Sequence, residues 1–590
     1  MRAPSSAATR RIETAASPSA SAMVTAEATI ASRVSADRRL FVSRAHTGPR
    51  AFSEASSTRP SVRRSGKPLH RTKIMARGDT PYEKCATVYE IAIRRTERGH
   101  SMETTVEAPM GFDSALRRTA VVVALGAIMT ILDTTIVNVA INTLGRDFHT
   151  SLSTIQWVIA GYTLALSMTI PITGWVIERF GPKTMWITAL ALFIGGSLLC
   201  GLAWSAPALI AFRVVQGIGG GLLMPVGQTM LAREAGPGRM GRAMAVISIP
   251  GMLAPVLGPV LGGVVVDHFS WRWLFFVNVP FCALALLLAV RMLPRDEERR
   301  AGAPLDWVGL ALLSPGLAAL VYGCSQAGGG SGLTSPSALA GLAAGVLLLG
   351  AFVLWSLRRG ERALLDLRLF RRRAFTTGVG ALFLYSASIF GLLILAPLYY
   401  QTAGGHSALD AGLLIAPLGV GAIITMPVAG RLTDRFGSRG LGIAGILLAM
   451  AGTLVFTTIG AATPPALLAA ALFTVGLGHG LVIPSLAAAP YQGLPKQLIP
   501  AATTMSNIAI RVATSFGVAV LALVLQLRLQ AGVPGGDGTL AGVAVHGSEV
   551  AGAVAHAFGG SFWWALAIGA TALVPAALLP RRAIEGVRRR

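Results

Sequence analysis

Four side chains that can carry charge lie within strongly apolar runs of the sequence, namely Asp133, Arg213, Arg511 and His479. A charge near the middle of a membrane costs at least ~2.5–3.5 kcal/mol on insertion scales, so each such group needs a partner or a purpose. A carboxylate can neutralise a guanidinium, and a carboxylate that exchanges its proton can couple transport to a proton gradient. These residues are therefore the first candidates for chemistry inside a membrane.

The elements that would position them are membrane helices. Of the 590 residues, 53% are hydrophobic and 13% charged, whereas an ordinary soluble domain has about a quarter charged residues. Apolar segments of about 20 residues, each long enough to cross a bilayer, follow one another from Arg118 onward. We predict an all-α polytopic membrane protein with fourteen spans, at about 118–141, 154–176, 184–204, 207–230, 243–266, 273–293, 306–324, 337–357, 376–400, 409–430, 440–460, 465–490, 503–525 and 560–579.

Arginine clusters occupy alternate loops, as the positive-inside rule requires if both termini are cytoplasmic. These loops account for the net charge of +24. The sequence has no stripe of basic residues with interleaved aromatics, so the positive charge does not indicate nucleic-acid binding.

Residues 1–116 are rich in Ser, Ala, Thr and Arg and lack periodicity. We expect a disordered tail there, or an extension ahead of a true start at Met102 or Met110, rather than a targeting peptide.

Two short loops share the pattern G-x-x-x-[DE]-R-F-G-x-[KR]. The sequence GWVIERFGPK (174–183) follows the second span, and GRLTDRFGSR (430–439) follows the tenth. The repeat predicts two related six-helix bundles, a design in which the substrate site commonly lies at the interface. The predicted domains are an extension (1–116), an N-terminal bundle (117–293), loops with two linker spans (294–375), a C-terminal bundle (376–580) and a basic cytoplasmic tail (581–590).

The fifth span contains a glycine- and proline-rich stretch, Gly251–Gly263. Ala254, Gly258 and Gly262 recur every four residues, so they share a helix face that lets another helix approach closely. Pro255 and Pro259 each remove a backbone donor, which bends or softens a helix. By itself the stretch predicts either tight packing or a bend where two halves of a transporter meet.

Several motifs within residues 117–580 together resemble the major facilitator superfamily, specifically its fourteen-span drug–proton antiporter family. They are the twin loops (signature motif), Leu132–Ala140 (first-span motif), Arg213–Gly221 (fourth-span motif), Gly251–Gly263 (antiporter motif) and Trp271–Pro280. Glu178 stands where the signature usually has Asp, and Asn142 where the first-span motif usually ends in Pro.

The resemblance implies that the helices of Asp133 and Arg213 line one cavity. The two residues lie at similar depth, and we expect protonation of Asp133 to weaken their contact; a permanent ion pair is the alternative. Arg511 either neutralises a carboxylate or substrate or snorkels to the cytoplasmic side. His479 either titrates near neutral pH or, as we favour, is a hydrogen-bonded packing residue.

Three further groups of residues follow from the same resemblance. The expected gating residues are Gly174, Glu178, Arg179, Gly181 and Lys183, with Gly430, Asp434, Arg435, Gly437 and Arg439 in the second loop. The expected antiporter-motif residues are Gly251, Pro255, Gly258, Pro259, Gly262 and Gly263; the last two glycines and Gly258 should approach the opposite half, and the prolines should shape a bend near the outer gate. The expected polar and aromatic cavity residues are Asn138, Gln156, Trp157, Tyr162, Gln216, Tyr385 and Gln401.

The predicted function is proton-coupled export of amphipathic, often cationic, drugs or other small molecules across the cell membrane by alternating access. The expected working unit is a monomer, and its partners are substrate, protons and lipid. No P-loop, H-E-x-x-H motif, catalytic Cys/His cluster or C-x-x-C pair indicates an enzyme, a metal site or a cofactor. A dedicated metabolite exporter, an uptake symporter and a membrane receptor without transport are the alternatives.

Overall fold

The computed structural model describes residues 113–236, 238–296, 304–327, 335–460, 463–532 and 551–581. The predicted N-terminal extension (except its last four residues) and nearly all of the basic tail therefore lie outside the described residues. Every regular element in the described part is a helix. Many of their large apolar side chains are exposed, as expected for helices that face lipid.

The N-terminal set has six spans. They are α3 (Ser114–Ile136) continued by η1 (Val137–Ala140) and α4 (Ile141–Asp147); α5 (Leu152–Thr169) continued by η2 (Ile170–Ile172) and α6 (Thr173–Phe180); α7 (Pro182–Gly201); α8 (Ala206–Ala235); α9 (Met240–His268); and α10 (Trp273–Phe276) with α11 (Asn278–Met292). Pro171 lies in the η2 break, where its missing N–H interrupts the helical ladder.

Two linker spans and a second six-span set follow. The linkers are α12 (Trp307–Ala327) and α13 (Pro336–Arg359), followed by η3 (Gly360–Arg362) and η4 (Leu367–Arg371). The C-terminal set is α14 (Arg373–Thr402), α15 (Ala408–Phe436), α16 (Ser438–Thr457), α17 (Pro465–Ala488) with η5 (Ala489–Tyr491), η6 (Lys496–Leu498), α18 (Ile499–Gly532), α20 (Ala551–Thr571) and α21 (Leu573–Leu578).

The predicted spans each correspond to one long helix or one run of joined helices. Thirteen spans in the described residues have the length and apolar composition to cross a membrane, and α9, with 29 residues, supplies the fourteenth long helix. The predicted all-α fold class is confirmed.

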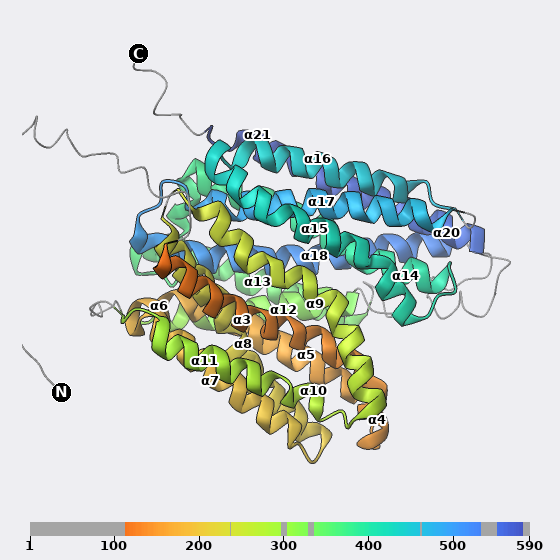
Figure 1. Ribbon diagram of the computed structural model, residues 1–590, viewed down its shortest axis with the longest axis horizontal. Helices are drawn as coiled ribbons and strands as arrows, with labels where there is room; N and C mark the ends of the chain where they lie inside the picture. Colours follow the sequence, from red (N-terminus) through yellow and green to blue (C-terminus); the bar gives the residue numbers. More distant parts are fainter. Residues whose placement is uncertain are drawn as a thin grey trace, which may run out of the picture. The chain divides into compact units, whose positions relative to one another are not determined.

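The two six-helix sets are packed together mainly at one end. In Figure 1 the N-terminal set (orange to yellow-green) and the C-terminal set (cyan to blue) lie close together where α3 begins, and they diverge towards α4 and α20. The apolar core around Trp186 continues at the first end into Phe375 of α14 and Met505 of α18. At the other end, the core around Trp271 and Phe275 contains N-terminal residues alone among those described.

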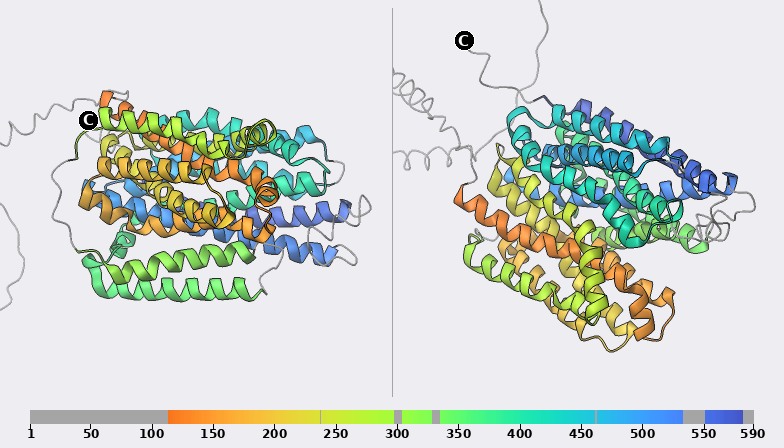
Figure 2. Two further views of the ribbon diagram at one scale, coloured as in Figure 1. Left: turned by 90° about the horizontal axis from the view of Figure 1, so that it is seen from below. Right: turned by 45° about the vertical axis from the view of Figure 1, so that its right-hand side comes forward.

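The linker helices form an antiparallel pair along one side of the bundle (Figure 2). α12 packs on both sets: its Ser314 hydroxyl donates to the Met168 carbonyl at 2.7 Å, and its Cys324 packs with Ala519 of α18. Trp157, a predicted cavity residue, stacks on Tyr322 of α12 with ring centroids 6.0 Å apart. The linkers therefore cover the seam between the two sets.

Candidate transport site and gate

Asp133 is the centre of a buried polar network in the N-terminal set. Its side chain has no exposed surface, and one carboxylate oxygen accepts a hydrogen bond from Arg213 Nη1 at 2.6 Å. The other oxygen accepts from Gln216 Nε2 at 2.9 Å and from Asn278 Nδ2 at 2.8 Å. The expected contact between Asp133 and Arg213 is thus present, and two amides complete the shell of the carboxylate.

The network joins five spans of the N-terminal set. Ser197 on α7 accepts hydrogen bonds from Gln216 at 2.7 Å and from Asn278 at 3.1 Å. Arg213 Nη1 donates to Gln216 Oε1 at 2.8 Å, and its Nε donates to the Val158 carbonyl of α5 at 3.2 Å. Each donor of a buried polar network needs such a partner, because an unmade hydrogen bond in a low dielectric is costly.

Sequence reasoning missed Ser197 and Asn278. Both are isolated polar residues in apolar spans, and Asn278 lies inside the Trp271–Pro280 stretch. A search for single polar residues in the third and sixth spans would have found them, since intramembrane polar groups are rarely unpartnered. The spacing along the chain, however, does not indicate that they meet Asp133.

Aromatic rings enclose the Arg213 guanidinium. Its Cζ lies 4.0 Å from the centroid of the Tyr162 ring and 5.8 Å from that of Phe275, within the range of cation–π attraction. Tyr162 is 1% exposed, and neither its hydroxyl nor Asn278 Oδ1 has a hydrogen-bond partner among the described residues. The opposite charges of Asp133 and Arg213 therefore neutralise each other, while the Tyr162 hydroxyl and Asn278 Oδ1 could still form hydrogen bonds.

His479 and Tyr385 form a second, neutral contact in the C-terminal set. The Tyr385 hydroxyl and His479 Nδ1 lie 3.1 Å apart, and the two rings stack. Both side chains are 3% exposed. In the order of the repeat, α14 and α17 correspond to α3 and α8, so a neutral pair occupies the helices equivalent to those of the ion pair.

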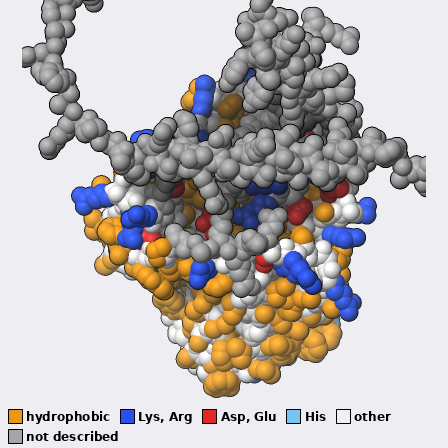
Figure 3. Space-filling view, turned by 90° about the vertical axis from the view of Figure 1, so that its left-hand side faces the viewer, with side chains coloured by type: hydrophobic (Ala, Val, Ile, Leu, Met, Phe, Trp, Pro, Cys, Tyr) orange, Lys and Arg blue, Asp and Glu red, His pale blue; other side chains and the backbone are white. Residues whose placement is uncertain are grey.

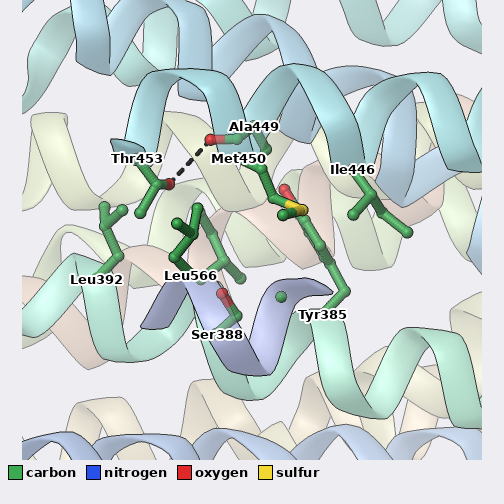
Figure 4. Close-up of a pocket in the computed structure, with 10 residues that line it drawn as sticks. Tyr385, Ser388, Leu392, Ile446, Ala449, Met450, Thr453 and Leu566 are labelled. Atoms are coloured by element: carbon green, nitrogen blue, oxygen red, sulfur yellow. Dashed lines mark hydrogen bonds between the residues drawn. The ribbon is translucent and has the colours of Figure 1, made fainter. Parts of the chain in front are cut away.

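Tyr385 also borders a small void rather than an open cavity. The void has a volume of roughly 10 Å³ and is lined by Ser388, Leu392, Met450 and Thr453 among others (Figure 4). About one water fits such a space, so it does not accommodate a transported molecule.

The expected cavity residues do not form one group. Tyr162 and Gln216 belong to the Asp133 network, and Tyr385 belongs to the packing around His479. The remaining four lie in exposed positions: Asn138, Gln156, Trp157 and Gln401.

The second signature loop holds the two sets together. Asp434 accepts hydrogen bonds from the Gly241 N–H at 2.7 Å and from Arg242 Nε at 2.7 Å, at the N-terminus of α9. A carboxylate is favoured there by the exposed N–H groups and the dipole of the helix. A Cβ at Gly241 would lie 2.6 Å from the Gly430 carbonyl oxygen, so the backbones of α9 and α15 touch. This contact joins the halves.

The first signature loop lies beside the equivalent helix of the other half. A Cβ at Gly174 would lie 3.3 Å from the Thr504 hydroxyl near the start of α18. Deeper along the same helix, Asn507 Nδ2 donates to Gln228 Oε1 of α8 at 2.7 Å. Each loop therefore contacts the fifth span of the opposite set.

Glycine is required at the turns of both loops. Gly181 and Gly437 have φ values of 88° and 85°, a conformation that side chains disfavour. A Cβ at Gly181 would also lie 2.2 Å from Asp296 Cγ. Asp296 itself accepts from the Lys183 N–H at 2.9 Å, a contact that was not predicted.

The basic residues of the loops have separate surroundings. Lys183 Nζ donates to the Leu293 carbonyl at 2.8 Å. Arg179 and Arg435 are exposed, and Arg435 lies over the Phe436 ring at 5.2 Å. Arg439 is half-buried in the first turn of α16.

The expectation that the antiporter-motif glycines approach the opposite half is wrong. A Cβ at Gly258 would lie 2.1 Å from Thr135 Oγ1 of α3, and one at Gly262 would lie 3.0 Å from the Ile136 carbonyl oxygen. Gly251 also faces α3, and a Cβ at Gly263 would meet no atom within 4 Å. These glycines press α9 against α3 within its own set, because the small-residue face of α9 points there.

Pro255 and Pro259 lie within the continuous α9, and their side chains are outside the described part of the structure. α9 approaches the opposite half at its other end, through Gly241 and Arg242. Within the motif, Gly258 and Gly262 therefore face α3 of their own set, whereas Met252 packs against the core of the C-terminal set.

Arg511 lies on α18, twelve residues after Ile499, or about 18 Å along the helix axis. It lies one helical turn after Asn507, whose amide bonds Gln228 of α8 in the other set at 2.7 Å, so the two residues share a face of α18. Within the described part of the chain no carboxylate pairs with Arg511. Arg511 therefore lies at the seam between the sets and not at a helix end.

Comparisons with known proteins agree with this architecture. Residues 123–518 match the Major Facilitator Superfamily. The chain is 35% identical over 527 residues to the "Multidrug resistance protein B homolog" of Mycobacterium tuberculosis, covering 86% of this chain and 97% of the relative. It is 32% identical to the "Putative multidrug resistance protein MdtD" of Klebsiella pneumoniae, covering 69% of this chain and 85% of the relative.

Solved structures show the same fold at low sequence identity. The proton:xylose symporter XylE superimposes with a TM-score of 0.52 at 17% identity, over 78% of this chain and 95% of XylE. The human organic anion transporter MFSD10 (TETRAN) gives a TM-score of 0.50 at 17% identity, over 78% of this chain and all of that one. The chain is a multi-pass membrane transporter that belongs to the major facilitator superfamily.

Proposed function

We propose that this protein exports amphipathic small molecules across the cell membrane in exchange for protons, by alternating access of a site between its two six-helix sets. The observation that carries this proposal is the position of Asp133. Every other carboxylate inside a described span lies within three residues of an end of that span. Asp133 is therefore the group suited to carry a proton across the membrane interior.

The surroundings of Asp133 can accommodate both of its protonation states. Arg213 and two amide donors stabilise the carboxylate. When the acid is protonated, the Asn278 amide can rotate and offer its unpaired Oδ1 as an acceptor. Protonation would remove the charge that holds Arg213, so the contact between α3 and α8 would weaken. A permanent ion pair would need no such spare acceptor.

The signature loops supply the gate in this proposal. Asp434 fixes the N-terminus of α9, while Asn507 and Gln228 close the seam below Arg511. Breaking these contacts would let the two sets separate at this end. Weakening of the Asp133–Arg213 contact, within one set, would then be coupled to a rearrangement between sets.

The orientation follows from the charge of the gated end. Lys and Arg side chains gather around the end at which α3 begins (Figure 3), and Arg117, Arg239, Arg358 and Arg431 lie in loops or helix ends there. The positive-inside rule places this end in the cytoplasm. We also propose that the two sets comprise about residues 117–293 and 376–580, that the two linker spans join them, and that the protein works as a monomer.

A susceptibility panel in an efflux-deficient host tests the proposal. Cells producing the wild-type protein should tolerate higher concentrations of some amphipathic compounds than cells with an empty vector. Asp133→Asn should return tolerance to the vector level, whereas Asp410→Asn, at the exposed end of α15, should not. Asp133→Glu keeps the carboxylate and controls for loss of folding. Full tolerance with Asp133→Asn at equal membrane abundance would reject the coupling role of Asp133.

A further inference from the structure

Arg511 is a cation inside the described spans that the Asp133–Arg213 ion pair does not neutralise. Arg213 is neutralised by Asp133 at 2.6 Å, and His479 is engaged by Tyr385. The carboxylates near the ends of the spans have other surroundings: Asp434 binds α9, and Asp306 binds Trp355 and Leu364. The interior of the described spans therefore has an excess of one positive charge, and it lies at the seam.

The position of Arg511 fits a ligand better than it fits packing. A guanidinium has five donors and its ordinary partners are carboxylate, sulfonate or phosphate oxygens. None of the described residues supplies such an oxygen to Arg511. Snorkelling would satisfy it with water at a membrane surface, but Arg511 lies one turn after Asn507, on the face of α18 that bonds Gln228 of α8 across the seam.

A second polar group without a partner belongs to α5 of the N-terminal set. The Tyr162 side chain is 1% exposed and its hydroxyl has no hydrogen-bond partner among the described residues. A phenol hydroxyl donates readily to an anionic oxygen. One turn along α18 towards the gated end, the bond between Asn507 and Gln228 joins α18 to α8.

We propose that Arg511 binds an anionic group of the transported molecule, so that the preferred substrates are amphipathic organic acids, carboxylates or sulfonates, rather than organic cations. This inference rests on the proposed transport function and specifies its substrate class. The charge balance favours it: a cation at the seam would meet Arg511 with no free carboxylate in the interior of the described spans to offset the repulsion. An anion replaces the missing counter-charge of Arg511.

A matched pair of probes tests the charge preference directly. Naphthalene-2-sulfonate and 2-naphthyltrimethylammonium share one aromatic body and carry opposite charges. Equilibrium binding to the purified full chain in detergent, without any proton gradient, should be tighter for the sulfonate by about 10-fold or more, as one charge-assisted hydrogen bond allows. Equal binding, or tighter binding of the ammonium probe, would overturn the inference, and this comparison needs no variant.

Variants then assign the preference to Arg511. Arg511→Gln should weaken sulfonate binding by about 10- to 100-fold and leave ammonium binding the same or tighter. Arg511→Lys should keep the preference for the anion with lower affinity. Arg528→Gln is the matched control, since Arg528 is an exposed arginine near the other end of α18. Equal weakening of both probes by Arg511→Gln would show a structural role and would refute the assignment.

The two proposals can fail separately. Sulfonate selectivity that depends on Arg511, in a protein without proton-coupled transport, would uphold the binding site and reject the coupling. Proton-coupled export of the ammonium probe that is unaffected by Arg511→Gln would uphold the transport function and reject the anion site.

Discussion

The contact between Asp434 and the start of α9 gives a prediction with a definite size. Asp434→Asn keeps the shape of the side chain but removes its charge. Two short bonds, from the Gly241 N–H and Arg242 Nε, then lose their anionic acceptor. The pair is largely buried, with side-chain exposures of 8% and 18%, so solvent screens it little. Hydrogen bonds to charged groups contribute about 1.5–3 kcal/mol and neutral ones about 1.

The expected loss is therefore about 2 kcal/mol for the two bonds together. This corresponds to a shift of about 30-fold in the equilibrium between the state with this contact and states without it. The shift favours separation of the two sets at the gated end. Transport should slow, because the variant favours one access state, while substrate binding should remain.

Electron spin resonance distances measure the shift. Labels at Thr188→Cys and Gly440→Cys, exposed positions on α7 and α16, report separation of the two sets after removal of the native cysteines. Asp434→Asn should increase the population of the longer distance. Asp410→Asn, on the same helix but at its other exposed end, should leave the distribution unchanged. An unchanged distribution in Asp434→Asn would refute the reasoning that this contact holds the gate.

Three further substitutions test the packing described above. Asn278→Ala removes a donor from the buried network and should lower thermal stability by about 1–3 kcal/mol, which a melting curve in detergent would measure; an unchanged curve would contradict the network. Gly258→Leu should block export without unfolding the protein, and Thr135→Gly should partly restore activity, whereas no rescue would place the clash elsewhere. Gly181→Ala should destabilise by at least about 1–2 kcal/mol because of its positive φ, while Gly440→Ala should not; equal melting temperatures would refute the strain.

Hydropathy and loop charge were sufficient to predict the helices. Each predicted span corresponds to one helix or one run of joined helices, because the length of an apolar segment is set by the thickness of the bilayer. The short 3-10 break at Ile170–Ile172 in the second span was not predicted. The twin loops predicted two related sets, and both loops lie beside the fifth span of the opposite set.

Sequence reasoning identified the charged members of the buried network, Asp133 and Arg213, but not the neutral ones. Asp133 and Arg213 were paired because opposite charges at similar depth have few other ways to be neutralised in a membrane. Asn278 and Ser197 carry no charge, so nothing along the chain indicates which helices they join. The direction of Gly258 was predicted wrongly for a related reason: a stripe of small residues shows that a helix comes close, but not which one.

Substrate-driven proton movement tests the central claim most directly. In proteoliposomes with an acidic lumen and a pH-sensitive dye inside, addition of a substrate from the susceptibility panel outside should speed the rise of luminal pH with the wild-type protein. Asp133→Asn should abolish this response while it still binds the substrate. A substrate-dependent proton efflux of wild-type size in Asp133→Asn would contradict the role of Asp133 as the proton carrier.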